Sequence, residues 1–260
     1  MNTHNLLVAL AVLHQGDWGQ IYRALSEKKY PDEYEVDALY NSVKAKTLTI
    51  LDEGYPSYLK RYLHPPFVLF YYGDISLLRN PDIILGVVGT RKPSPYGLEN
   101  TTKLVSEVAN RYIIISGMAM GVDKAAHLAA INAGGKTIAV LGTGIDVCYP
   151  SECQDIYEIM KENHLVISEY PNSIIFPSQF SFPARNRIIS QISNALLVTE
   201  SAPKSGTFIT VSHSMSMNKD IMCLPSNDLN NSGCNLLIKE GAALVENSQD
   251  IVNVMERFLL

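Results

Sequence analysis

Short apolar runs separated by polar stretches dominate the chain from about residue 47 onward. Six of these runs are about six residues long: IILGVVG, YIIISG, TIAVLG, LVISEY, ALLVTE and DIMCLP. Two earlier runs, LTIL and FVLFYYG, lie on either side of a charged stretch that ends in Pro65 and Pro66. Helix-like stretches separate most of the later runs. Buried strands that alternate with helices predict an α/β fold with a mostly parallel sheet covered on both faces.

The first 45 residues follow a different pattern. Leucine and isoleucine recur there at helical spacing, at Leu6, Leu7, Leu10, Leu13, Ile21 and Leu25. Gly16 and Gly19 interrupt the series, and the charged stretch LSEKKYPDEYEVD follows it. We therefore predict a small helical pair in an N-terminal region, residues 1–45, followed by one Rossmann-like domain, residues 46–260.

Composition and charge limit the function classes. The chain has 260 residues, 47% of them hydrophobic, and a formal net charge of -5, so any nucleic-acid contact must come from a local basic patch. No C-x-x-C pair occurs among the four cysteines, which predicts reduced thiols in a cytoplasmic protein and no metal site. We expect no signal peptide, because a basic leader is absent, and no membrane span, because no apolar stretch reaches about 18 residues.

The segment VVGTRKPSPYG places Gly89, Thr90 and Arg91 directly after a predicted strand, with a helix starting near Tyr96 or Gly97. A glycine permits close approach of a ligand, and an arginine can bind a phosphate through two hydrogen bonds. The same residues also suit an ordinary strand-to-helix turn with a solvated arginine. The spacing alone leaves both interpretations open.

The segment ISGMAMGVDKAAH forms a second turn of this kind, bracketed by Gly117 and Gly121. Asp123 stands where the cap of the following helix is expected, so we assign it a structural role. His127 lies one turn further on, where a packed or surface histidine is more common than a catalytic one.

Two other glycine-rich stretches do not predict a cofactor. AGGKT has Ala130 where a P-loop requires glycine, and it precedes a strand instead of following one. GTGIDV has Val147 in place of the third glycine of a dinucleotide fingerprint. We therefore expect no cofactor.

The strongest signal is the stretch FPARNR, followed after one strand by KSGTF. We expect Arg185, Asn186 and Arg187 at the start of a helix, where cations oppose the helix dipole unless an anion binds there. The turn with Lys204, Ser205, Gly206 and Thr207 has the composition of a phosphate cradle. Residues 176–219 carry four basic groups against Glu200, a local charge of +3. The structural alternative is a charged network in which Glu200 pairs with an arginine.

These segments, together with YPSYL, PPFVLFYYGD, ISEYP and GCNLLIKEGA, appear in the order found in the DNA processing protein A (DprA, or Smf) family, which the chain resembles over roughly residues 48–245. The resemblance implies an extended Rossmann-like fold without enzymatic activity that binds single-stranded DNA. It also implies protection of incoming DNA during natural transformation, loading of the RecA recombinase and a homodimer. By resemblance, Gly89–Arg91 grip phosphate, the FPARNR and KSGT loops complete the pocket, and Phe182 offers a stacking face.

The chain departs from the family pattern at several positions. Many members have a basic residue where this chain has Met120, and some have lysine near Gln179, so we expect modest DNA affinity. Many relatives have Pro-Gly where this chain has Pro225-Ser226. Several relatives continue into a winged-helix-like domain, which we do not expect here.

The alternative from another class is a nucleotide-processing hydrolase that acts on nucleoside monophosphates. Those enzymes use a G-G-x-G-T turn followed by a glutamate, but KSGTFIT lacks the paired glycine and has Val211 at the glutamate position. No G-x-S-x-G or H-E-x-x-H motif supports another enzyme. A third possibility is a protein that mainly recruits a recombinase, which is compatible with DNA binding.

Overall fold

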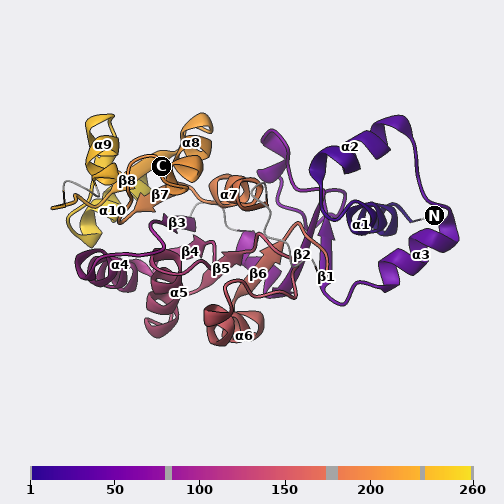
Figure 1. Ribbon diagram of the computed structural model, residues 1–260, viewed down its shortest axis with the longest axis horizontal. Helices are drawn as coiled ribbons and strands as arrows, with labels where there is room; N and C mark the ends of the chain where they lie inside the picture. The colour runs from indigo at the N-terminus through magenta and orange to yellow at the C-terminus, as the bar shows by residue number, and fades with distance from the viewer. Residues whose placement is uncertain (1, 80–83, 174–180, 229–231, 259–260) are drawn as a thin grey trace.

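A computed structural model describes residues 2–79, 84–173, 181–228 and 232–258 of the chain (Figure 1). The described strands form one sheet in the order β1-β2-β6-β5-β4-β3-β7-β8-β9. Their bounds are β1 Lys46–Thr49, β2 Val68–Gly73, β3 Ile84–Val88, β4 Ile113–Ser116, β5 Thr137–Val140, β6 Leu165–Ser168, β7 Ala195–Val198, β8 Asp220–Cys223 and β9 Ala243–Leu244.

The predicted strands are confirmed. Each of the eight apolar runs contains or overlaps a strand, and β3 to β9 pair in parallel, while β2 pairs antiparallel with both β1 and β6. The α/β fold with a mostly parallel sheet is therefore correct. The two-residue strand β9 was not predicted, because so short a segment carries no periodic signal.

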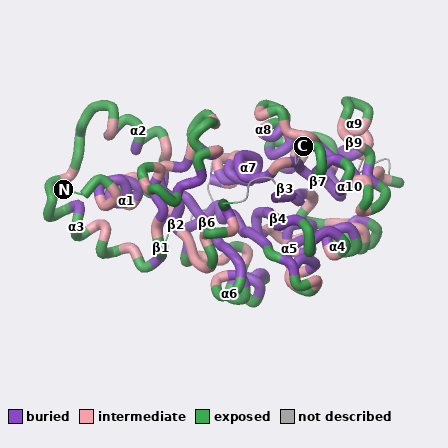
Figure 2. The backbone as a smooth tube through the Cα atoms, turned by 180° about the vertical axis from the view of Figure 1, so that it is seen from behind, coloured by how far each residue is buried: buried purple, intermediate pink, exposed green. Residues whose placement is uncertain are grey.

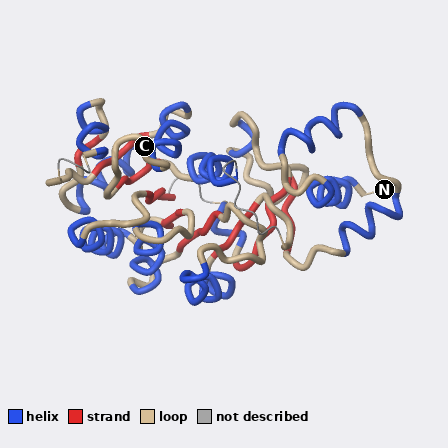
Figure 3. The backbone as a smooth tube through the Cα atoms, in the orientation of Figure 1, coloured by secondary structure: helices blue, strands red, loops and turns tan. Residues whose placement is uncertain are grey.

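Helices cover both faces of the sheet (Figure 3). Their bounds are α1 Thr3–Leu13, α2 Trp18–Glu27, α3 Glu33–Asn41, α4 Pro95–Val108, α5 Val122–Asn132, α6 Gln154–Asn163, α7 Ser181–Ile192, α8 Thr207–Ser216, α9 Gly233–Lys239 and α10 Ser248–Met255. In β4, Ile113 and Ile115 pack with α7, whereas Ile114 packs with α4 and α5. Alternate residues of a strand point to opposite faces, so each face has its own core.

The N-terminal region has three helices instead of the predicted pair. The charged stretch that follows the predicted helical series contains a third helix start, since the Asp32 side chain accepts a 2.8 Å hydrogen bond from Glu35 N and caps α3. Helix α1 is deeply buried: Leu6 and Leu10 share a core cluster with Phe70 of β2 (Figure 2). The division of the chain at residue 45 stays a prediction.

Helix α5 places His127 in the core, in keeping with the expectation of a packed or surface histidine at this position. His127 is fully buried, and its Nδ1 lies 2.7 Å from Thr137 Oγ1. Burial lowers the pKa of His127 to about 3, so its ring is neutral near neutral pH.

Across the described ranges, every helix is too short or too polar to cross a bilayer.

Candidate functional site

A cleft of about 330 Å³ opens at the edge of the sheet where β3 and β7 end. Strand order reverses here, because the chain passes from β3 to β4 on one side and later returns to β7 on the other. Such a reversal leaves a crevice at the carboxyl ends of parallel strands. Four segments form the walls: the β3–α4 loop, the start of α5, the first turns of α7 and the start of α8.

The β3–α4 loop is held in place by backbone hydrogen bonds. Thr90 N donates to Glu200 O at 2.8 Å, and Val122 N donates to Thr90 O at 3.1 Å. A Cβ at Gly89 would lie 2.5 Å from Val122 Cγ2, so only glycine fits there. Arg91, which follows, is exposed and lines the cleft. The loop therefore presents Arg91 from a fixed backbone.

Phe182 forms the aromatic side of the cleft. The Arg91 and Arg185 guanidinium carbons lie 5.3 Å and 5.7 Å from its ring centroid, and the Tyr149 ring lies 5.9 Å away. A Cβ at Gly142 would approach the Phe182 ring to 2.7 Å. Sequence reasoning missed Gly142, because the turn that contains it was considered only as a failed dinucleotide motif.

Arg185 forms the floor of the cleft instead of its rim. It is buried, and its Nη1 donates to Gly117 O and, at 2.8 Å, to Val140 O. A side chain at Gly117 would overlap this guanidinium, which explains the glycine. Burial raises the pKa of the neighbouring Asp123 carboxyl, while the positive charge of Arg185 opposes that shift. The floor thus holds a buried cation and a buried acid, each of which forms hydrogen bonds with the backbone.

The predicted helix cap at Asp123 is wrong. Helix α5 begins at Val122 after Gly121, which caps it without a side-chain hydrogen bond, and Asp123 accepts a long 3.4 Å bond from Ala119 N. Gly121 has the positive φ of +81°, and this backbone kink moves the helix start one residue upstream of the carboxylate.

The helix-start prediction for the FPARNR stretch is also wrong. The described part of α7 begins at Ser181, so Arg185 lies in the second turn and does not face the helix dipole at its end. Asn186 lines the cleft and accepts a 2.9 Å hydrogen bond from Arg185 Nε. Gln179 lies outside the described residues. Met120 is half-buried beside Phe182 in a small adjoining pocket.

The four basic groups counted along residues 176–219 do not gather in one place. Arg187 lies outside the cleft and pairs with Glu169 at 2.6 Å. Lys219 lies at the opposite edge of the sheet, and Lys204 is exposed just before the start of α8. Only Arg185 of the four lines the cleft, so a count along the sequence overstated the local charge.

Glu200 contacts the start of helix α4. Its carboxylate accepts hydrogen bonds from Ser94 N at 3.0 Å and Ser94 Oγ at 2.7 Å, at the residue that caps α4. A side chain at Gly97 would overlap this carboxylate. Glu200 therefore fixes the start of α4 behind the Arg91 loop.

The start of α8 forms the fourth wall. Gly206 caps the helix without a side-chain hydrogen bond, and Thr207 is its first residue. Ser205 Oγ lies 2.8 Å from Ser201 Oγ, which orders the turn. Phe208 N donates to Ser205 O at 3.0 Å and Ile209 N donates to Gly206 O at 3.2 Å. The positive end of the α8 dipole still faces this wall, so the wall can receive an anion opposite Arg91.

Gly121→Ala is expected to destabilise the Arg91 loop. A Cβ there would lie 2.7 Å from the Arg91 carbonyl carbon, whereas Gly134 has a similar φ of +77° with open space around it. We expect Gly121→Ala to lower the free energy of unfolding by roughly 1–3 kcal/mol more than the control Gly134→Ala. Denaturant unfolding of both variants measures the difference, and equal losses would show that the loop tolerates the added atom.

Comparison with known proteins places this geometry in a family. The chain matches the family described as DNA recombination-mediator protein A over residues 46–256. It is 40% identical over 216 residues to DNA processing protein DprA of Streptococcus pneumoniae, covering 82% of this chain and 75% of that protein.

Two solved structures are similar over most of the chain. The X-ray structure of DprA from S. pneumoniae has a TM-score of 0.78 and 34% identity, covering 96% of this chain and 92% of that one. A structure of DNA processing protein A from Helicobacter pylori, described for its single-stranded DNA binding mode, has a TM-score of 0.74 and 29% identity, covering 82% and 97%. The chain therefore belongs to the DNA recombination-mediator protein A family, known as DprA or Smf.

Proposed function

We propose that this protein binds single-stranded DNA in the cleft without catalysing a reaction on it. Phosphate groups lie against Arg91 and the start of α8, and one base stacks on Phe182. The observation that carries the proposal is the convergence of the Gly89–Arg91 loop, Phe182 and the Ser205–Thr207 turn on one cleft. The single-stranded DNA binding described for the H. pylori relative supports it.

The chemistry of the cleft predicts weak sequence preference. Phosphate contacts carry no base information, and stacking accepts any base. The cleft is narrow and lies between helix ends, so a rigid duplex reaches its floor less well than an unpaired strand. Arg185 is buried and donates to backbone carbonyl groups, which leaves Arg91 as the exposed cation among the described residues that line the cleft.

A band-shift comparison tests the proposal. A single-stranded oligonucleotide is expected to bind more tightly than the duplex of the same sequence, and its affinity should fall steeply with salt, because each phosphate contact releases counterions. Equal binding of both forms at two salt concentrations would contradict the assignment of the cleft. Incubation with nucleoside monophosphates should release no free base, and a release would favour the hydrolase alternative.

We further propose that the protein acts as a homodimer in the cytoplasm, protects incoming DNA during natural transformation and helps to load the RecA recombinase. Family membership supports these steps, and nuclease protection with RecA filament formation on a bound strand tests them. A protein that binds the strand but neither shields it nor speeds filament formation would confine the proposal to DNA binding.

A further inference from the structure

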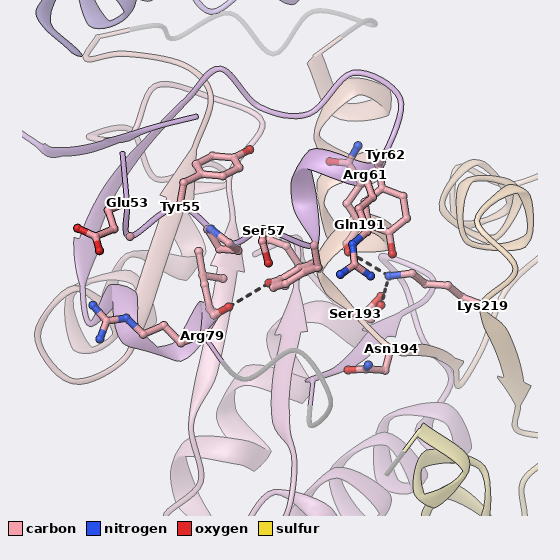
Figure 4. Close-up of a pocket in the computed structure, with 15 residues that line it drawn as sticks. Glu53, Tyr55, Ser57, Arg61, Tyr62, Arg79, Gln191, Ser193, Asn194 and Lys219 are labelled. Atoms are coloured by element: carbon pink, nitrogen blue, oxygen red, sulfur yellow. Dashed lines mark hydrogen bonds between the residues drawn. The ribbon is translucent and has the colours of Figure 1, made fainter. Parts of the chain in front are cut away.

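A second cavity lies at the opposite edge of the sheet from the cleft, where β3, β7 and β8 begin. Its volume is about 930 Å³, nearly three times that of the cleft. The β1–β2 connection, the end of α7, Lys219 and the two residues Leu78 and Arg79 surround it (Figure 4). The segments meet there because Asn194 Oδ1 accepts a 3.0 Å hydrogen bond from Ile84 N and joins the start of β3 to the residue before β7.

The lining of this cavity is positively charged in an acidic protein. Arg61, Arg79 and Lys219 line it together with one acid, Glu53. Both arginines are exposed, and among the described residues neither side chain takes part in an ion pair or a hydrogen bond. In Figure 4, Arg79 lies toward one end of the cavity and Arg61 toward the other. Two unpaired guanidinium groups at the ends of one cavity are suited to two phosphate groups.

Lys219 is held against the wall beside Arg61. Its Nζ donates to Ser193 O and, at 3.0 Å, to Gln191 O, and it lies 5.0 Å from the Tyr62 ring centroid. Burial lowers the pKa of Lys219 to about 7. These contacts cap the last carbonyl groups of α7 and fix the position of the Tyr62 ring, so Lys219 shapes the cavity instead of reaching into it.

Aromatic rings line the space between the two arginines. Tyr55 Oη donates to Pro66 O at 2.8 Å and Tyr58 Oη donates to Leu78 O at 3.2 Å, so both hydroxyl groups are anchored and the rings are held. Tyr55 packs in the core at 4% exposed, whereas Tyr58 and Tyr62 are half-buried and present ring surface to the cavity. Fixed aromatic rings accept nucleobases by stacking, independent of base identity.

Two polar groups in the wall lack a hydrogen-bond partner among the described residues, Ser193 Oγ and Gln191 Oε1. Gln191 is fully buried, and its Nε2 donates to Leu63 O at 3.1 Å, but its Oε1 has no hydrogen-bond partner among the described residues. An unpaired buried acceptor is costly and calls for a donor from a ligand or water. The amino groups of nucleobases are donors of this kind.

We propose that this cavity binds a nucleotide with phosphate groups on both sides of its sugar, the phosphates at Arg61 and Arg79 and the base against the tyrosine rings between them. A free nucleoside bisphosphate and one residue within a DNA strand present the same chemistry. The inference is independent of the function proposed for the cleft, since the two sites lie at opposite edges of the sheet.

Photolabelling of the full chain tests the proposal. The probe is an azido derivative of adenosine with one phosphate on each side of the ribose, and mass spectrometry identifies the labelled peptide. We expect the label within residues 53–62 or 191–194. Arg61→Ala and Arg79→Ala are each expected to weaken labelling about tenfold, because each removes a charge-assisted phosphate contact. Arg23→Ala, an exposed arginine of α2, is the matched control and should change nothing.

The same experiment separates the two ligand sources and the two sites. An oligonucleotide carrying the azido base serves as the second probe, and labelling of the cavity by this probe alone would identify a DNA strand as the ligand. The label at the cavity should persist in Arg91→Ala, so the result at the cavity can be interpreted even if DNA binding at the cleft is lost. Labelling confined to peptides with Tyr149 or Phe182, or no labelling by either probe, would overturn the proposal.

Discussion

The double variant Arg91→Ala/Phe182→Ala is expected to lose nearly all affinity for single-stranded DNA. A charge-assisted phosphate contact contributes about 1.5–3 kcal/mol and a stacked base about 1–3 kcal/mol, so the two losses would total roughly 2.5–6 kcal/mol if they were additive. The Arg91 guanidinium lies 5.3 Å from the Phe182 ring centroid, so the two losses are expected to be coupled and not additive. A titration of a labelled oligonucleotide with both single variants and the double variant measures each term.

The single variants separate charge from stacking. Arg91→Ala should flatten the dependence of log affinity on log salt by about one unit, whereas Phe182→Ala should leave that slope unchanged. Arg91→Lys keeps the charge but not the paired hydrogen bonds, so it should retain the slope and lose affinity. Near-wild-type binding by the folded double variant would show that the strand lies elsewhere.

Glu169→Ala is expected to produce the largest loss of stability. The Glu169 and Arg187 side chains are 7% and 11% exposed and lie 2.6 Å apart, so removing the carboxylate leaves a buried guanidinium without its partner. Breaking a buried pair in this way costs about 3–5 kcal/mol. Denaturant unfolding, followed by circular dichroism, gives the change in free energy.

The matched control is the exposed pair of Arg111 and Glu256, whose side chains are 52% and 50% exposed at 2.8 Å. Glu256→Ala should change stability by no more than about 1 kcal/mol, because water screens that pair. If Glu169→Ala cost as little as Glu256→Ala, water or a neighbouring group would be compensating Arg187. Arg187→Ala would then become worth testing for a direct effect on DNA affinity.

The strands of the fold could be predicted because the residues within each strand segment are enough to indicate it. Runs such as those of β3 and β7 are short, continuous and apolar, and a strand buried on both faces requires that composition. The Gly89–Arg91 loop and the Ser205–Thr207 turn could be assigned to one edge of the sheet, because the carboxyl ends of parallel strands lie at the same edge. The third N-terminal helix was missed, since its cap at Asp32 lies inside a charged stretch that conceals the helix start.

The sequence by itself determined the parallel sheet, its glycine-containing turns and the family, all of which depend on the order of residues along the chain. Only the tertiary structure decided the partners of the charged groups: Arg187 with Glu169, Glu200 with Ser94, Arg185 with the backbone, and Lys219 at the far edge of the sheet. Charges close in sequence point to different sides of a helix or lie at opposite ends of a strand. Their environment is set by contacts between distant segments, and local pattern carries no information about those contacts.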